Sequence, residues 1–442
     1  MLIVTLKAVI LAGGRGTRLS SMTKDIIPKV LVQVAGKPVI VRQMELLTKH
    51  GVKEIIVTTG YLSEVLFNYL GNDFHGTKIV YAKEEQPLGT AGGLSALKGQ
   101  LDDDFFLLYG DVVCDMNLTR LMEYHRNRKG SGTLVVHPND HPFDSDLIAT
   151  DHQGRICKFL PETERGDGWY RNLVNAAVYV FSPKIFNYIL DNVKQDFVKD
   201  VFPRVIADGQ LLWAYETTEY LKDMGTYERL ARVEIDYNYR IPELLRLSNY
   251  RPAVFIDRDG VLNREVDNLC CAEDLELIPG VALAIRHLNK AGYLVIIVTN
   301  QPMIAKGFLN EEELARIHAK LETLLGYQGA FIDKIYYCPH HPEKGHYGEV
   351  THLKIDCECR KPKAGMFFKA FKEFSIDKSK SLMIGDSWRD AAAAQAAGLR
   401  FYGVRSGWGC RNMPQELKPL EIFEDLASAV DHLIESCSSR RL

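Results

Sequence analysis

The sequence has no long run of lysine or arginine, and its 54 basic residues against 57 acidic ones leave a formal net charge of -3 at pH 7. Proteins that bind nucleic acid through its phosphates carry a basic patch or stripe, so we expect no nucleic-acid partner. No apolar run approaches the ~20 residues that a membrane-spanning helix requires, so we expect no membrane partner either. Small molecules are therefore the expected substrates.

Export signals and a disulfide framework are also missing. The apolar opening of the chain is interrupted by Lys7, has no basic segment before it and runs directly into a glycine-rich motif, so we expect no cleaved signal peptide. The 9 cysteines are an odd number, which suits free thiols or metal ligands in a reducing compartment. We therefore expect a cytoplasmic protein.

Length and periodicity divide the chain into domains. Its 442 residues exceed what one ordinary hydrophobic core accommodates, and 46% apolar and 25% charged residues are typical of globular domains. Residues 236–252 fit neither helical nor strand periodicity and end in Pro252. We predict an N-terminal domain over residues 1–235, a linker over 236–252 and a C-terminal domain over 253–442.

Short apolar runs alternate with helical patterns on both sides of this linker. Strands are predicted at residues 8–11, 54–58, 105–109, 133–136, 176–181, 253–256, 294–298, 334–337, 382–384 and 401–404. Helices are predicted at residues 39–50, 118–128, 281–291, 311–325 and 391–397. This alternation predicts the α/β class, with two Rossmann-like three-layer domains and a predominantly parallel sheet in the first.

A glycine-rich segment with basic residues follows the first predicted strand. Its glycines are Gly13, Gly14 and Gly16, and the nearby cations are Arg15, Arg18 and Lys29. Glycines let the backbone approach a polyphosphate closely, and the cations supply the charge that phosphates need. The spacing fits neither a dinucleotide fingerprint nor a Walker loop. A tight turn is the alternative interpretation, but the cations favour phosphate binding.

The segment from Leu11 to Leu19, with Pro28-Lys29 downstream, resembles the signature of nucleoside-diphosphate-sugar pyrophosphorylases, which join a sugar 1-phosphate to a nucleoside triphosphate. Motifs at residues 85–92, 109–111, 175–179 and 222–226 agree with this family. The resemblance implies a nucleotidyltransferase fold, catalytic roles for Arg15 and Lys29, and substrate contacts from Gly13, Gly14, Gly16, Thr17, Arg18, Gly89, Thr90, Ala91 and Asn175. Phe159-Leu-Pro-Glu162 departs from the Glu-Lys-Pro that the family often has there.

Two aspartates of this domain, Asp111 and Asp223, are predicted to bind Mg²⁺. Attack of a sugar phosphate on the α-phosphorus of a nucleoside triphosphate gathers several negative charges, which a metal ion and cations must neutralise. Carboxylate oxygens are the hard ligands that Mg²⁺ prefers. Either aspartate alone would more often be a turn residue, but both together with the basic loop favour a metal site.

The C-terminal domain opens with an apolar strand that ends in Asp257-Arg258-Asp259-Gly260. Carboxylates at the carboxyl end of a strand mark the reactive edge of an open α/β sheet. With Thr299-Asn300-Gln301, Arg360-Lys361-Pro362 and Gly385-Asp386, this segment resembles the four motifs of the haloacid dehalogenase superfamily over residues 253–410. Four motifs in the right order are far more specific than one Asp-x-Asp.

This second resemblance implies a phosphatase that works through an aspartyl phosphate. Asp257 would be the nucleophile and Asp259 the acid and base, while Lys361 neutralises charge. The implied substrate-binding residues are Thr299, Asn300 and Arg360, and the implied Mg²⁺ ligands are Asp257, Asp259 and Asp386. Asp390 either supports this metal or occupies the first turn of a helix; we favour support.

Three cysteines and a histidine precede Lys361 with the spacing of a metal site: Cys338, His340, Cys357 and Cys359. Two ligand pairs, each separated by one residue, predict a structural zinc, because four protein ligands leave no open position. Four unrelated side chains are the alternative. The neighbouring His341, His346 and His352 are predicted to be solvated loop residues.

Between Asp257 and Thr299 the sequence has room for a loop, one helix and a strand, so no large cap domain is expected. A capless domain with this cysteine and histidine loop looks most like the D,D-heptose 1,7-bisphosphate phosphatases, with histidinol-phosphate phosphatases as close relatives. Pro302-Met303 and Ser387 depart from the usual residues, which bears on substrate preference rather than on reaction type.

The two resemblances fit one pathway, in which a phosphatase makes heptose 1-phosphate and a nucleotidyltransferase activates it. We expect a bifunctional NDP-heptose biosynthesis enzyme that uses Mg²⁺ at both sites, structural zinc, heptose 1,7-bisphosphate and a nucleoside triphosphate. GTP is favoured because the resemblance is nearest to heptose and mannose 1-phosphate guanylyltransferases. The alternatives are a hexose 1-phosphate nucleotidyltransferase fused to a histidinol-phosphate-like phosphatase, and a non-catalytic NDP-sugar sensor domain on a phosphatase. No oligomeric state follows from the sequence.

Overall fold

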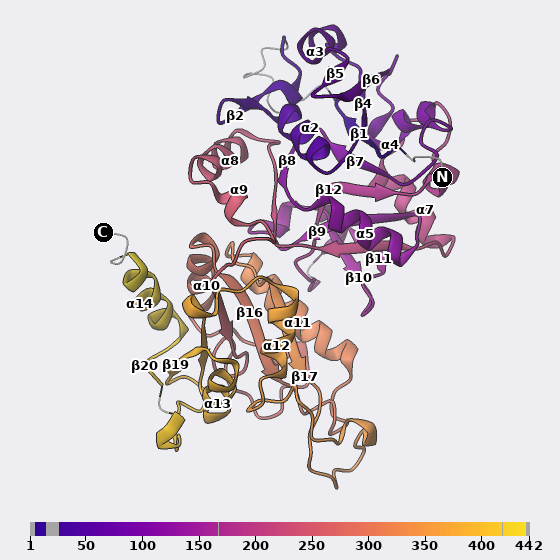
Figure 1. Cartoon of the computed structure of the whole chain (residues 1–442). Helices are drawn as coiled ribbons and strands as arrows, with labels where there is room; N and C mark the ends of the chain where they lie inside the picture. Colours follow the sequence, from indigo (N-terminus) through magenta and orange to yellow (C-terminus); the bar gives the residue numbers. More distant parts are fainter. Residues whose placement is uncertain (1–4, 15–25, 167, 418, 439–442) are drawn as a thin grey trace. The chain divides into compact units, whose positions relative to one another are not determined.

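A computed structural model describes residues 5–14, 26–166, 168–417 and 419–438 of the chain. The chain divides into two compact units, each with its own large sheet (Figure 1). The first unit comprises Met1–His137, Asp146–Pro161 and Leu173–Leu247, and the second comprises Pro138–Ser145, Glu162–Asn172 and Ser248–Leu442. Two short segments of the predicted N-terminal domain therefore pack with the second unit. The boundaries of the two catalytic domains stay a prediction.

The first unit is built on a 10-stranded mixed sheet with the main order β11-β10-β12-β7-β1-β4-β6-β5, and β9 and β13 join it beside β12. Strands β7, β1, β4 and β6 are parallel, whereas β12 is antiparallel to β7, β9 and β10. The expected parallel arrangement thus holds for the centre of the sheet and for the β9–β13 pair. A buried strand reads as the same apolar run in either direction, so its own residues do not reveal its neighbour's direction.

The strands of the first unit have the following bounds. They are β1 Lys7–Leu11, β2 Gln33–Val34, β3 Lys37–Pro38, β4 Glu54–Thr59, β5 Asp73–Phe74, β6 Thr77–Lys83, β7 Phe105–Tyr109, β8 Val112–Asp115, β9 Gly132–His137, β10 Leu147–Thr150, β11 Ile156–Leu160, β12 Val174–Phe181, β13 Leu212–Glu216 and β14 Tyr220–Asp223. Strands β2 and β3 form one small antiparallel pair, and β8 and β14 form another.

Helices cover both faces of this sheet. They are α2 Val39–Lys49, α3 Ser63–Leu70, α4 Gly89–Gly92, α5 Leu118–Arg128, α7 Phe202–Ala207, α8 Tyr227–Asn238 and α9 Ile241–Leu244. In β1, Ala8 and Ile10 face the core formed with α2, α3 and α5, whereas Val9 faces the core formed with α4 and α7. Alternating strand side chains therefore give three layers. Helices α8 and α9 extend into the predicted linker.

The second unit has a six-stranded, all-parallel sheet with the order β17-β16-β15-β18-β19-β20. Its strands are β15 Ala253–Ile256, β16 Leu294–Asn300, β17 Lys334–Cys338, β18 Leu382–Gly385, β19 Arg400–Val404 and β20 Glu421–Phe423. The strand order reverses between β15 and β18. Ligand sites of open α/β sheets lie at the carboxyl ends of the strands beside such a reversal.

Helices α10 Val281–Lys290, α11 Glu311–Gly326 and α14 Leu426–Ser438 cover one face of this sheet, and α12 Gly365–Glu373 and α13 Trp388–Ala397 cover the other. A short helix, α6 Glu162–Arg165, belongs to one of the two added segments. Between Asp257 and β16 the chain forms only loops, one 3₁₀ turn and α10, so the expected absence of a large cap agrees with the fold. Within the described ranges, no helix has the length and apolarity to cross a bilayer.

Candidate active sites

Two aspartates meet at the carboxyl edge of the second unit's sheet. Asp257 follows β15, and Asp386 follows the parallel neighbour β18. The backbone N–H of Asp257 donates to the carbonyl oxygen of Ile384 (3.1 Å). Carboxylate oxygens of Asp257, Asp386 and Asp390 all lie within 4.8 Å of one another. The strand reversal thus brings Asp257 together with Asp386 and Asp390, which come from a distant part of the sequence.

Lys361 is the cation of this cluster, and its side chain is only 2% exposed. Its Nζ lies 2.8 Å from Asp257 Oδ2 and 2.6 Å from Asp390 Oδ1, and it donates to the carbonyl of Val298 (2.8 Å). Burial would lower the pKa of Lys361, but the two carboxylates outweigh burial and raise it. The side chain of Asn300 exchanges two hydrogen bonds, each 3.0 Å, with the backbone of Lys361.

Asp386 lies in a narrow backbone cradle. Its Oδ2 accepts a hydrogen bond from the backbone N–H of Trp408 (2.7 Å). Side chains at Gly260 and Gly407 would bring a Cβ within 2.4 and 2.0 Å of this oxygen, and both residues have positive φ angles, +75° and +63°. Glycine is therefore required at both positions. Burial, and then the Asp390 carboxylate, raise the pKa of Asp386 to about 7.

The charge balance of this cluster fits a divalent cation. Three carboxylates share one lysine in a buried site, and an uncompensated buried charge is costly. The oxygens are hard ligands of the kind that Mg²⁺ takes. Asp390 occupies the first turn of α13, where it accepts hydrogen bonds from Ser387 as a capping box, and it also pairs with Lys361. Support of a metal ion by Asp390 stays a prediction.

Asp259 lies outside this carboxylate cluster and has its own partners. The fully buried Arg258 binds both of its carboxylate oxygens (2.9 Å each), and Asn263 and Gln301 donate to it at 3.1 and 2.9 Å. Burial would raise the pKa of Asp259, but Arg258 and these hydrogen bonds hold it below its usual value. Gln301 also donates to Thr299 Oγ1 (2.9 Å). Sequence reasoning missed Arg258, although an arginine between two aspartates at the end of a buried apolar strand was a signal.

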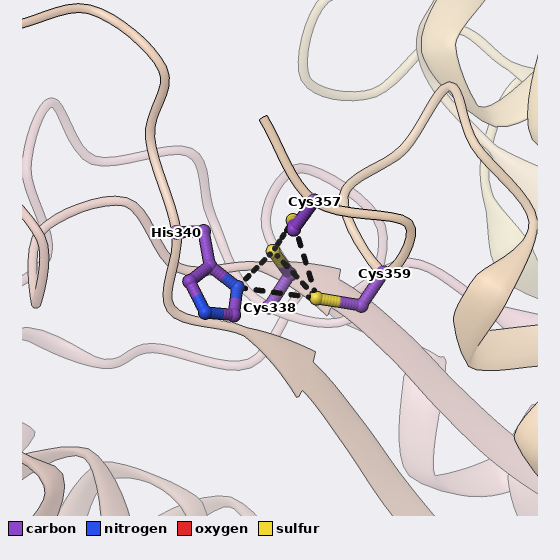
Figure 2. Close-up of side chains that lie close together, drawn as sticks. All are labelled: Cys338, His340, Cys357 and Cys359. Carbon is purple, nitrogen blue, oxygen red and sulfur yellow. Dashed lines mark hydrogen bonds between the residues drawn. The ribbon is translucent and has the colours of Figure 1, made fainter. Parts of the chain in front are cut away.

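The four predicted metal ligands of the cysteine and histidine loop meet in space, and Figure 2 shows their side chains pointing toward one another. The hydrogen-bonded Sγ–Sγ and Sγ–Nδ1 distances within this set lie between 3.2 and 3.6 Å, and the set consists of Cys338, His340, Cys357 and Cys359. A tetrahedral ion with ligand distances of about 2.3 Å requires edges of about 3.7 Å, so these residues could hold a metal ion. The hydrogen bond between Cys338 and Cys359 lowers the pKa of Cys359 to about 5 and raises the pKa of Cys338, so one thiolate of the set forms readily.

The loop also reaches the substrate-binding edge of the sheet. Cys338 ends β17 in register with Asn300 of β16. Arg360 follows Cys359 and donates to the carbonyl of His340 (3.2 Å). Ordering the metal ligands therefore also orders the backbone that leads to Lys361.

In the first unit, Lys29 and Asp111 form an ion pair with Nζ 2.6 Å from Oδ2. Asp111 follows Gly110, where any Cβ would come 2.7 Å from the carbonyl oxygen of Leu11. The buried Gln43, which sequence reasoning missed, donates to the carbonyls of Tyr109 and Val112 on either side of this turn (2.8 and 2.7 Å). The turn that presents Asp111 is therefore fixed by packing and by hydrogen bonds.

Asp223 lies beside this turn. In the β8–β14 pair it is opposite Val112, and the N–H of Met224 donates to the carbonyl of Asp111 (3.0 Å). Arg229 Nη1 lies 2.8 Å from each carboxylate oxygen of Asp223. The two predicted metal aspartates are thus brought together, and each has a cationic partner.

Gly13 and Gly14 follow β1, while Arg15, Gly16, Thr17 and Arg18 lie outside the described residues. The carboxylate of Glu84 lies beside Gly13 and also packs against Gly93, where a Cβ would come 2.3 Å from Glu84 Oε1. Burial raises the pKa of Glu84. This carboxyl beside the glycine-rich segment was not singled out from the sequence.

The predicted sugar-contacting residues have clear structural partners. Gly89 has φ +79°, and a Cβ there would come 2.4 Å from the carbonyl oxygen of Gln195. Thr90 donates to Asp196 (2.8 Å), and the buried Ala91 donates its N–H to Gln195 (3.0 Å). These hydrogen bonds to Gln195 and Asp196 fix the loop that contains Gly89, Thr90 and Ala91. Substrate contacts from these three residues stay a prediction.

Asn175 lies at a bulge in β12, where the pairing with β9 is interrupted before Tyr179. Its Nδ2 contacts the Tyr179 hydroxyl (2.9 Å), and its Oδ1 accepts from the N–H of Ala177, which has φ +54°. A bulge of this kind redirects a side chain out of the regular strand alternation. The sequence signal was only the motif around Asn175.

Models of known protein families match separate parts of the chain. A family model described as "Nucleotidyl transferase" matches residues 7–239, and one described as HAD-hydrolase-like matches residues 358–429. The chain is 43% identical over 156 residues to the D-glycero-beta-D-manno-heptose-1,7-bisphosphate 7-phosphatase of Rhodopseudomonas palustris, covering 35% of this chain and 84% of the relative.

The N-terminal half has other relatives. It is 35% identical over 225 residues to the mannose-1-phosphate guanylyltransferase catalytic subunit beta of Drosophila pseudoobscura pseudoobscura, covering 50% of this chain and 59% of that protein's length. The crystal structure of HddC from Yersinia pseudotuberculosis complexed with GMP-PN matches 53% of this chain and 100% of its own, with 25% identity and a TM-score of 0.46. The chain belongs to the nucleotidyl transferase family and, in its C-terminal half, to the family of the D-glycero-beta-D-manno-heptose-1,7-bisphosphate 7-phosphatases.

Proposed function

We propose that the chain is a bifunctional enzyme of NDP-heptose biosynthesis. Its second unit hydrolyses the 7-phosphate of D-glycero-D-manno-heptose 1,7-bisphosphate, and its first unit transfers a nucleotidyl group to the resulting heptose 1-phosphate with release of pyrophosphate. The observation that carries this proposal is the cluster in which Lys361 lies between Asp257 and Asp390 beside Asp386. The 43% identical relative supports the choice of substrate.

In the proposed hydrolysis, Asp257 Oδ attacks phosphorus and forms an acyl phosphate, while the bond from phosphorus to the sugar oxygen breaks. Because the pKa of Asp259 is held low, this carboxylate takes up a proton as the anionic substrate binds and gives that proton to the sugar oxygen. Water then attacks phosphorus and gives its proton back to Asp259, and the acyl bond breaks to restore the Asp257 carboxylate. Lys361 stabilises charge on the nucleophile, and Thr299, Asn300 and Arg360 bind the substrate.

Metal ions complete both proposed sites. Mg²⁺ held by Asp257 and Asp386, with Asp259 beside them, would neutralise phosphoryl oxygens during hydrolysis. In the first unit Asp111 and Asp223 would hold Mg²⁺ on the triphosphate, while Arg15 and Lys29 neutralise its charge. Zinc on the four cysteine and histidine ligands would be structural, because four protein ligands leave no open position.

GTP is the proposed nucleotide, because a 35% identical relative is a guanylyltransferase. The same relative favours a second candidate for the first unit, transfer to mannose 1-phosphate. For either sugar, the proposed triphosphate-binding residues are Gly13, Gly14, Gly16, Thr17 and Arg18. The proposed base- and sugar-binding residues are Gly89, Thr90, Ala91 and Asn175. We place the enzyme in the cytoplasm, because 9 cysteines suit a reducing compartment.

Phosphorus NMR tests the proposal. The protein is incubated with Mg²⁺, each nucleoside triphosphate in turn, and either heptose 1,7-bisphosphate or mannose 1-phosphate. We expect inorganic phosphate from the bisphosphate, followed by pyrophosphate and GDP-heptose. Absence of both inorganic phosphate and any NDP-sugar would reject it, and an NDP-sugar from mannose 1-phosphate alone would favour the second candidate.

A further inference from the structure

Two segments from within the stretch that matches the nucleotidyl transferase model pack with the second unit. They are Pro138–Ser145 and Glu162–Asn172, and the second begins where Phe159-Leu-Pro-Glu162 departs from the usual family motif. Asn139 and Asn172 tie the two segments together through two hydrogen bonds of 3.2 and 2.7 Å. The two segments are therefore held to each other within the second unit.

The segment 169–172 is bound along one stretch of helix α11. The N–H of Tyr170 donates to the Thr323 hydroxyl (2.9 Å), and the N–H of Asn172 donates to the Glu322 carboxylate (2.7 Å). Asn172 and Thr323 are each only 1% exposed. Buried backbone groups that lose such partners carry a desolvation cost, so these bonds hold α11 at a defined position.

Trp169 contacts the same helix one turn earlier. Its ring lies 5.7 Å from the guanidinium carbon of Arg316 and 5.1 Å from Nζ of Lys320. It also packs against the apolar core of the second unit. Cation–π contacts of this kind are individually modest, but they fix the helix at a second point.

Helix α11 carries His318, which leads to the catalytic edge. The Nε2 atom of His318 lies 3.2 Å from Nη1 of Arg258, and Arg258 binds both oxygens of Asp259. Burial, and then the charge of Arg258, lower the pKa of His318 to about 3, so the neutral ring accepts the hydrogen bond. A bidentate arginine fixes both the distance and the plane of a carboxylate.

We propose that residues 169–172 position the acid/base aspartate of the phosphatase site, acting through α11, His318 and Arg258. The inference rests on the proposed phosphatase function. Thr323, Glu322 and His318 are positioning residues, because none of them is placed at the reacting phosphoryl group. Loss of their contacts should slow the step in which Asp259 takes a proton from water, while Asp257 can still be phosphorylated.

The test uses the full chain and 4-nitrophenyl phosphate, whose leaving group needs no proton from the enzyme. Rapid mixing measures the burst of nitrophenol, which reports phosphorylation of Asp257, and the later steady rate, which reports hydrolysis of the acyl phosphate. Thr323→Val removes the hydroxyl at nearly constant volume, and Thr323→Ser is the matched control. We expect Thr323→Val to lower the steady rate at least about tenfold while the burst stays near one nitrophenol per enzyme.

The control Thr323→Ser should behave as the unmodified chain. His318→Leu provides an independent variant and should give the same pattern, whereas His318→Gln keeps an acceptor for Arg258 and should restore hydrolysis. Unchanged kinetics in both Thr323→Val and His318→Leu would overturn the inference. So would a parallel fall of burst and steady rate in variants whose melting temperature equals that of the unmodified chain, because both steps would then depend equally on these contacts. An unmodified chain that releases no nitrophenol would contradict the proposed phosphatase itself.

Discussion

In the second unit one lysine lies between two carboxylates, whereas in the first unit each predicted metal aspartate has a cation of its own. Lys361 is 2.8 Å from Asp257 and 2.6 Å from Asp390, with Asp386 nearby. Lys29 pairs with Asp111, and Arg229 pairs with Asp223. The second site therefore has more carboxyl groups than cations, and burial raises the pKa values of Asp257 and Asp386, so these carboxyls resist ionisation without a further cation. The two predicted metal aspartates of the first site have no such excess.

This difference follows from what each proposed substrate brings. A nucleoside triphosphate carries several negative charges that need both Mg²⁺ and protein cations, so balanced carboxylates suit a metal that binds together with the nucleotide. The nucleophile of a phosphatase must instead be an ionised carboxylate that can reach phosphorus beside its metal. The four predictions below test the comparison.

The largest expected effect is on the nucleophile. Asp257→Asn should lower phosphatase activity on the order of 10⁴-fold or more, because the acyl phosphate can no longer form. Nucleotidyl transfer from heptose 1-phosphate should be unchanged. Phosphate release and NDP-sugar formation are measured on the same preparation, and retained phosphatase activity would refute the role of Asp257.

Asp111→Asn is the corresponding substitution in the first unit and should affect the other activity. Loss of a metal ligand should lower nucleotidyl transfer by about 10²–10³-fold, with phosphate release from the bisphosphate intact. Pyrophosphate release is the assay. Nucleotidyl transfer that survives the substitution would show that Asp111 does not serve the metal, and would leave its pair with Lys29 as a structural contact.

Removal of one cysteine ligand should have a smaller catalytic effect. Cys338→Ser should reduce bound zinc, lower the melting temperature and weaken phosphatase activity by about 10–100-fold, because the loop that leads to Lys361 loses its anchor. Metal content is measured by atomic emission and stability by calorimetry. The exposed Cys157 lies outside the cluster, and Cys157→Ser should change none of the three.

The smallest expected effect concerns metal binding without substrate. Titration calorimetry should detect Mg²⁺ binding that Asp386→Asn removes and Asp223→Asn leaves in place, because carboxyl groups outnumber cations in the second site, whereas Asp111 and Asp223 each have a cationic partner. Addition of GTP should then reveal a second binding event that depends on Asp223. Equal loss in both variants without GTP would break the comparison.

The sequence predicted most of the second unit because its chemistry lies at the ends of regular strands. A buried run such as residues 253–256 ends abruptly in charge, and parallel strands present their carboxyl ends at one edge. The cysteine and histidine loop was equally readable, because ligand spacing is local. Arg258 was missed because its partner His318 lies 60 residues further along the chain.

The first unit was harder to predict. A motif identified Asp111 and Asp223, but their ion pairs with Lys29 and Arg229 depend on tertiary packing. The bulge at Asn175 and the antiparallel β12 also follow from neighbouring strands rather than from local residue types. The association of residues 162–172 with the second unit had no sequence signal beyond the departure at Phe159-Leu-Pro-Glu162.

The central claim is that one chain carries two separate catalytic sites that act in order, phosphatase first. The direct measurement mixes the Asp257→Asn and Asp111→Asn variants with heptose 1,7-bisphosphate, Mg²⁺ and GTP and follows GDP-heptose by phosphorus NMR. Within the time that the unmodified chain needs to complete the reaction, neither variant alone should form detectable GDP-heptose, and the mixture should, because heptose 1-phosphate released by one can be used by the other. GDP-heptose from either variant alone, or none from the mixture, would contradict the account.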